Sequence, residues 1–290
     1  MKKKHLFFVF LITILTLAGC GTANNSQPET NENQGTETQD TSWTDVEASG
    51  KLIVGTSGTY SPITFVDENN ELTGFDVELV RALGEKLGVE VEFKRMEFDG
   101  ILPSLRNGQI NIAANDFAIT QERLETFDFV TPHKFSYGSA IVRAEDVDKF
   151  ENALDLKDVK IALGSMTSNY AQFANNIGAD AVAYDGGTQA ILQDVANGNR
   201  DAFLNDRLVL LRTLEDYGDD RLAVAENVKF HATESAIIML KGKTALKERL
   251  DQAMQELLED GTVAKLSKQF LGEDVSQPVD QSEIVSLEGN

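Results

Sequence analysis

The 290-residue chain has one cysteine, one tryptophan and three histidines. A single cysteine excludes an intramolecular disulfide. The histidines, His5, His133 and His231, are scattered and lack the spacing of metal ligands. No GxSxG, GxxxxGK or GxGxxG motif occurs, so these signatures of a serine nucleophile, a phosphate loop and a dinucleotide site are missing. We therefore expect no metal, no cofactor and no enzymatic activity.

Basic residues are also scarce. Lysine and arginine total 26 against 47 acidic residues, which gives a formal net charge of -21. So acidic a balance argues against nucleic acid as a partner and against electrostatic adhesion to anionic lipid.

The only long apolar run lies at the N-terminus. Lys2, Lys3 and Lys4 precede the run Leu6–Leu17, which is short for a membrane span and typical of an export signal. The run ends in Leu17-Ala18-Gly19-Cys20, which resembles a bacterial lipobox. We expect residues 1–19 to be a lipoprotein signal peptide and Cys20 to carry acyl chains, such as palmitate, that anchor the protein to the membrane.

Two polar stretches flank the remainder. Residues 20–42 have almost no aliphatic side chains and are expected to be a disordered tether, and residues 276–290 are expected to be a disordered tail.

Between these stretches, strand and helix patterns alternate, which indicates an α/β fold with mainly parallel sheets. The expected strands are 52–55, 89–96, 109–114, 138–143, 160–163, 179–184, 201–205 and 235–240. The expected helices are 75–87, 98–106, one beginning near 121, 169–176, 188–196, 207–214, 245–259 and 263–270. In such folds ligands bind beyond the carboxyl ends of the strands.

Arg123 lies just after one of these strand ends. Thr120 is the expected N-cap of the following helix, and a cation in the first turn is disfavoured by the helix dipole. Arg123 could pair with an acid on a solvated face, with Glu122, Glu125 and Asp128 as candidates. Alternatively, its guanidinium could hold a carboxylate.

Other strand ends allow two interpretations as well. Gly164–Ser168 could bind an anion at a helix N-terminus or only cap that helix. Asp206 could be a ligand-binding acid or an N-cap. Tyr60 and Phe98 could be ordinary core aromatics.

Several segments resemble the family 3 solute-binding proteins of polar amino-acid ABC importers. They are Gly58–Pro62, Gly74–Val80, Phe98–Leu105, Ile119–Arg123 and Phe127–Pro132. Leu163–Tyr170 and Leu204–Leu208 are most similar to the cystine-binding branch of Gram-positive lipoproteins.

The resemblance implies a two-lobed, periplasmic-binding-protein-like fold of type II. Lobe 1 would comprise residues 43–138 and 230–275, and lobe 2 residues 139–229. Two hinge crossovers are implied near Tyr137–Val142 and Val228–Ser235. The implied protein is a monomer on the outer face of the cell membrane that works with an ABC permease and its ATPase.

The resemblance also implies roles for site residues. Arg123 would grip a ligand α-carboxylate with backbone N–H groups of Thr167 and Ser168, near Gly164. Asp206 would accept the α-ammonium.

The aromatic rings of Tyr60 and Phe98 would flank the ligand side chain. Ser57, Asp116 and Ala118 depart from residues common in the cystine branch. Asp116 could supply the acid missing at Ser57, or the preferred ligand could have changed.

These features favour a non-enzymatic receptor for a polar amino acid, with L-cystine first among the candidates. A receptor for another polar or cationic amino acid is the nearest alternative. An exported lyase similar to cyclohexadienyl dehydratases, with Asp116 as the catalytic acid, and a ligand-sensing ectodomain are further alternatives.

The lipobox generates the first prediction. Cys20→Ser should release the protein from membranes, because two or more acyl chains, each contributing ~0.8 kcal/mol per buried CH₂, would otherwise hold it there. Fractionation of cells checks this, and a variant that stayed wholly with membranes would contradict the lipid anchor.

Overall fold

The computed structural model describes residues 40–185 and 187–287. The expected signal peptide, Cys20 and residues 20–39 of the expected tether lie outside the described residues. No helix within the described ranges is both long enough and apolar enough to cross a membrane.

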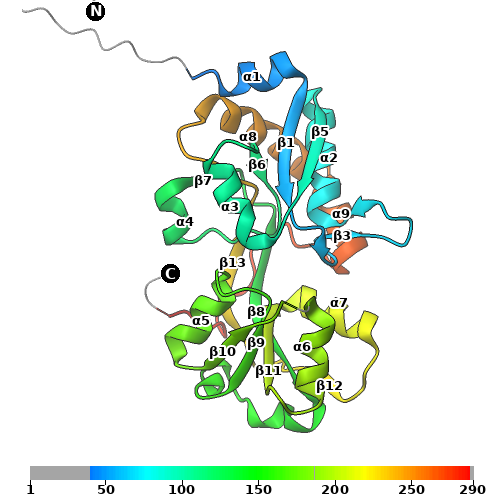
Figure 1. The fold of residues 1–290 in the computed structure, drawn as a ribbon, viewed down its shortest axis with the longest axis vertical. Coiled ribbons are helices and arrows are strands. Elements are labelled where there is room, and N and C mark those ends of the chain that lie inside the picture. Colours follow the sequence, from blue (N-terminus) through cyan, green and yellow to red (C-terminus); the bar gives the residue numbers. More distant parts are fainter. Residues whose placement is uncertain (1–39, 186, 288–290) are drawn as a thin grey trace, which may run out of the picture. The chain divides into compact units, whose positions relative to one another are not determined.

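Lobe 1 is built on a five-stranded sheet with the order β5-β1-β6-β14-β7 (Figure 1). Its strands are Lys51–Thr56 (β1), Glu90–Arg95 (β5), Ile112–Ala113 (β6), Phe127–Phe129 (β7) and Ile238–Leu240 (β14). The pairs β1–β5 and β1–β6 are parallel, whereas β14 is antiparallel to β6 and β7. A separate three-stranded sheet follows β1 in the chain and consists of Thr59–Tyr60 (β2), Thr64–Val66 (β3) and Leu72–Thr73 (β4).

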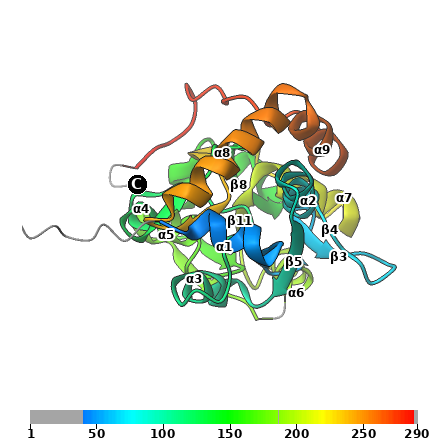
Figure 2. The same cartoon turned by 90° about the horizontal axis from the view of Figure 1, so that it is seen from above.

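Apolar helix faces build the core of lobe 1. The helices are Ser42–Ser49 (α1), Phe75–Leu87 (α2), Phe98–Arg106 (α3), Gln121–Thr126 (α4), Thr244–Glu259 (α8) and Thr262–Leu271 (α9). In α2, Leu79, Val80 and Leu83 recur at helical spacing and are fully buried. Helix α1 packs against α8 near the point where both helices begin (Figure 2), and Asp40 accepts a hydrogen bond from the backbone N–H of Ala245. The folded part therefore includes residues 40–42 of the expected tether.

Lobe 2 is built on a second mixed sheet with the order β10-β9-β11-β8-β12. Its strands are Lys134–Arg143 (β8), Lys160–Leu163 (β9), Asp180–Ala183 (β10), Ala202–Asp206 (β11) and Leu222–Val224 (β12), with Phe230–Ser235 (β13) paired to β8. Its helices are Asn169–Ile177 (α5), Gly187–Ala196 (α6) and Arg207–Tyr217 (α7), with 3₁₀ turns at Ala144–Lys149 and Ala153–Leu156.

Two antiparallel strands, β8 and β13, run between the lobes (Figure 1). Gly138 of β8 lies under the ring of Phe230, where a Cβ atom would come within 2.4 Å of that ring. The Phe230 ring in turn stacks on Phe173 of α5, with 3.9 Å between ring centroids. A side chain at position 138 would therefore displace the packing that joins β13 to lobe 2.

The two-lobed α/β class with two crossovers is confirmed. Each sheet is mixed rather than mainly parallel, because the crossover strands and their neighbours add antiparallel pairs. The strand expected at 235–240 is divided between β13 and β14, since the chain returns from the crossover to lobe 1 at this point.

The C-terminal segment makes contacts with lobe 2. Within residues 276–287, which the sequence predicts to be disordered, Val285 pairs with Phe230, and Val285 and Leu287 pack against the core of lobe 2. The backbone N–H of Val285 donates to the carbonyl of Lys229, and Glu283 pairs with the Lys229 ammonium at 2.5 Å. The sequence pattern missed this because only two apolar side chains anchor an otherwise polar segment.

His231 lies under this segment and generates a pH prediction. Burial lowers the pKa of His231 from 6.5 to about 4. An unfolded chain protonates this residue first as the pH falls, so the free energy of unfolding should decrease between about pH 6.5 and pH 4.

Denaturant unfolding near pH 7 and near pH 4.5 measures this effect. His231→Asn is the matched variant, because asparagine does not titrate and tolerates the positive φ of 45° at this position. The variant should lose less stability on acidification than the natural protein. Equal losses would exclude His231 as a source of the acid sensitivity.

Candidate functional site

Residues of both lobes line a cavity of about 500 Å³. Seven of the expected ligand-binding residues are among them, namely Ser57, Tyr60, Phe98, Asp116, Arg123, Gly164 and Ser168. Thr167, Ala118 and Asp206 are not. The structure therefore brings most of the candidate residues together around one space.

Strand ends position these side chains. Ser57 follows β1, Asp116 follows β6, Gly164 follows β9 and Asn205 lies near the end of β11. The parallel strands of each sheet point their carboxyl ends at the cavity, which is where α/β folds bind ligands.

Arg123 is a buried cation that forms no ion pair with an acid among the described residues. Its residue is only 8% exposed, and its side chain donates one hydrogen bond, at 2.8 Å, to the carbonyl of Ala118. Its guanidinium lies over the ring of Phe117, 5.2 Å from the centroid. No carboxylate of residues 40–185 or 187–287 forms an ion pair with it. Burial lowers the pKa of Arg123, but an arginine stays charged in proteins.

Thr120 is confirmed as the N-cap of α4, because its hydroxyl accepts the backbone N–H of Arg123 at 3.3 Å. The solvated ion pair considered for Arg123 is not formed within the described residues. The guanidinium faces the cavity instead.

The Gly164–Ser168 segment makes contacts within lobe 2 and across to lobe 1. Ser168 caps α5 by accepting the backbone N–H of Ala171, and the backbone N–H of Thr167 donates to the hydroxyl of Ser165. The hydroxyls of Ser165 and Thr167 both donate to Asp99 of α3 at 2.7 Å. Thr167 thus joins the lobes in this structure, with its N–H engaged locally.

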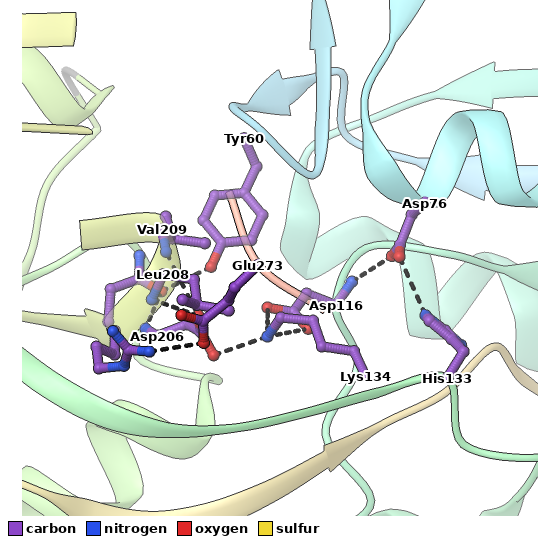
Figure 3. A network of polar contacts seen from close by, with 11 residues as sticks. Tyr60, Asp76, Asp116, His133, Lys134, Asp206, Leu208, Val209 and Glu273 are labelled. Carbon is purple, nitrogen blue, oxygen red and sulfur yellow. Dashed lines mark hydrogen bonds and ion pairs between the residues drawn. The ribbon is translucent and has the colours of Figure 1, made fainter. Parts of the chain in front are cut away.

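A buried ammonium lies between two carboxylates (Figure 3). The Lys134 Nζ atom is 3.1 Å from each oxygen of Asp116 and 2.7 Å from an oxygen of Asp206. We call these three residues the acid–lysine trio. Burial opposes the charge on Lys134, but the charges and hydrogen bonds of the two acids raise its pKa above the ordinary value. The trio therefore carries one uncompensated negative charge.

Asp116 is held in an unusual backbone conformation. Its φ is 55°, in the left-handed region, and its backbone N–H donates to Asp76 at 2.7 Å. The other oxygen of Asp76 contacts Nε2 of the His133 ring at 3.2 Å (Figure 3). These contacts fix the direction in which the Asp116 carboxylate points.

Asp206 has two structural partners. One carboxylate oxygen caps α7 by accepting the backbone N–H groups of Leu208 and Val209, and the other accepts from Lys134. Asp206 is fully buried. The capping alternative is therefore observed, and Lys134 holds the place beside Asp206 that the resemblance gives to a ligand ammonium.

Two aromatic residues lie along the cavity. Burial raises the pKa of Tyr60, so its protonated hydroxyl donates to Asn205 across the cavity at 2.6 Å. The ring of Phe98 stacks on Phe117, with 5.4 Å between centroids. Tyr60 thus links the lobes, and Phe98 gives lobe 1 an apolar wall.

Sequence reasoning missed Lys134 and Asp99. Lys134 follows the sequence Thr-Pro-His. A lysine in such a polar segment is normally exposed to solvent. Its acidic partners are 18 and 72 residues away in the chain. Only its place at the start of a crossover strand could have marked it.

Comparisons with known proteins show what this chain is similar to. The chain is 37% identical over 286 residues to the probable ABC transporter extracellular-binding protein YckB of Bacillus subtilis, covering 97% of this chain and 96% of that protein. It is 32% identical over 278 residues to the L-cystine-binding protein TcyA of the same organism, covering 96% and 100%.

A solved structure of an ancestral arginine-binding protein bound to arginine is also similar. Its TM-score is 0.69 at 32% identity, and the match covers 77% of this chain and 99% of that one. Residues 52–273 match the sequence pattern of a known family. The resemblance is thereby confirmed: this chain belongs to the bacterial extracellular solute-binding proteins, family 3.

Proposed function

We propose that this protein is the substrate-binding component of an amino-acid ABC importer and that its ligand is a polar amino acid, L-cystine. Arg123 carries the proposal, because a buried guanidinium that faces a cavity and has no ion pair within the described part of the chain is suited to an anionic ligand group. The family and the similar proteins named above support the same class of function.

The two charged ends of the cavity match an amino-acid zwitterion. Arg123 supplies one positive charge for the α-carboxylate, and the N-terminus of α5 at Ser168 adds a favourable dipole. The acid–lysine trio supplies one uncompensated negative charge for the α-ammonium, and Asp116 is the trio residue that lines the cavity.

The side chain of the ligand would lie between Tyr60 and Phe98. L-cystine is favoured because the cystine-binding protein TcyA matches nearly the whole chain. In this proposal Asp116 acts as part of the trio, because both of its carboxylate oxygens contact Lys134. It therefore contributes to the site for the ligand α-ammonium. The distal end of the ligand then meets the remaining cavity wall.

The proposed location follows from the expected lipid on Cys20, which would hold the protein at the outer face of the cell membrane. We propose that the protein is a monomer there. The bound amino acid would be delivered to a membrane permease driven by an ATPase.

A lyase reaction with Asp116 as catalytic acid is less favoured. Both oxygens of Asp116 already contact the Lys134 ammonium, whereas a catalytic acid needs an oxygen within hydrogen-bond reach of its substrate. Binding without chemistry fits this carboxylate better.

The Arg123 interaction predicts a large loss of affinity on mutation. Arg123→Ala should weaken L-cystine binding by about 2–5 kcal/mol, because the ligand carboxylate would be buried without a partner. Arg123→Lys should restore only part of this loss, since an ammonium lacks the two-pronged guanidinium geometry. Isothermal titration calorimetry measures both effects.

Arg106→Ala is the matched control, because Arg106 also lies over a phenylalanine ring of lobe 1, that of Phe127, without lining the cavity. The control should keep normal affinity. If Arg123→Ala bound L-cystine as tightly as the control, Arg123 would not hold the carboxylate. If the natural protein bound no amino acid, the proposed function itself would be refuted.

A further inference from the structure

The acid–lysine trio lies where the lobes and a crossover meet. Asp116 belongs to lobe 1, Asp206 to lobe 2, and Lys134 begins β8. All three side chains are at most 3% exposed. The trio is therefore part of the wall between the lobes rather than a surface ion pair.

Lys134 sets the charge of this wall. Without its ammonium, two buried carboxylates would share one region and would need a second cation for neutrality. With the Lys134 ammonium present, the trio needs one further positive charge for neutrality, and the ammonium of a zwitterionic ligand supplies it.

We propose that Lys134 is a specificity-determining residue whose ammonium takes the place of a second cationic group on the ligand. The site then favours amino acids of net zero charge over amino acids that carry an additional positive side chain. This inference rests on the proposed amino-acid-binding function and names the charge class of its ligand.

The contacts around Asp116 hold its carboxylate in a defined position next to Lys134. The Asp116 backbone N–H donates a hydrogen bond to Asp76, which holds the left-handed backbone of Asp116, and its carboxylate reaches Lys134 while the residue lines the cavity. The cavity also has acids at Glu97, Asp99 and Asp185, but these residues are exposed. Solvent and salt screen exposed charges more than buried ones, so the trio has the larger influence on ligand charge.

The test compares two ligands of nearly the same shape, L-arginine and L-citrulline, which differ in the charge of the side chain. The measured quantity is the ratio of the dissociation constant of L-citrulline to that of L-arginine, obtained by calorimetry. This ratio rises when the site prefers the cationic ligand.

Four proteins form a series of trio charges. The natural protein and Lys134→Met/Asp116→Asn have a net trio charge of about −1, Lys134→Met has about −2, and Asp116→Asn has about 0. We expect Lys134→Met to raise the ratio at least tenfold, which is about 1.4 kcal/mol. Asp116→Asn should lower the ratio, and the double variant should return it to the natural value within about threefold.

Lys134→Met leaves two buried acids unpaired, and this could prevent folding. The comparison of Asp116→Asn with the double variant avoids this problem, because removal of the lysine in that background leaves one acid that still caps α7. The ratio of dissociation constants should be at least about tenfold higher in the double variant than in Asp116→Asn.

Lys229→Met is the matched control. Lys229 precedes the other crossover strand and pairs with Glu283, away from the cavity. Its loss should leave the ratio unchanged.

A ratio that stayed constant between Asp116→Asn and the double variant would overturn the role of Lys134, even if the natural protein bound L-cystine. Failure of the natural protein to bind any amino acid would refute the proposed function and this inference together.

Discussion

The pairing of one buried ammonium with two carboxylates is the constraint on which the site depends. Removing one partner of a buried pair costs about 3–5 kcal/mol, because the other charge remains in a medium that solvates it poorly. Lys134 begins β8 and pairs with two carboxylates that other contacts hold in place: Asp116, whose backbone N–H donates to Asp76, and Asp206, which caps α7. In the proposed function, this contact between both lobes and a crossover would link ligand recognition to the relative position of the lobes.

Arg123 and the trio have complementary roles because each leaves one charge uncompensated. The guanidinium lacks an acid within the described residues, and the trio has one acid in excess. Separating opposite charges across a cavity costs free energy in the empty protein, and a ligand that carries both charges recovers it. Tyr60 and Phe98 line the same cavity, and in the proposal they contact an uncharged part of the ligand.

Much of the fold could be predicted because its signals are local. The helix bounds of Phe75–Leu87 follow from apolar spacing, and the Thr120 cap follows from one hydroxyl before a helix. The position of Arg123 in a cavity followed from the strand-end rule together with the resemblance. Lys134 and the Val285 contact could not be predicted in this way, because their partners are distant in sequence and a polar neighbourhood gives no sign of burial.

The engagement of Asp116 changes how a long ligand must be recognised. Both oxygens of Asp116 contact Lys134, so a distal ammonium that paired with Asp116 would have to displace the lysine or share the carboxylate with it. Sharing is the less costly arrangement, because it keeps Lys134 paired with Asp206. In the proposed arrangement Asp116 faces the ligand end nearest the trio, and the opposite end of a cystine-sized ligand would meet the cavity wall at Ser165 and Tyr184. The hydroxyls of these two residues donate to Asp99 and Asp194, so their oxygens would accept from a distal ammonium without adding net charge, as a site for ligands of net zero charge requires.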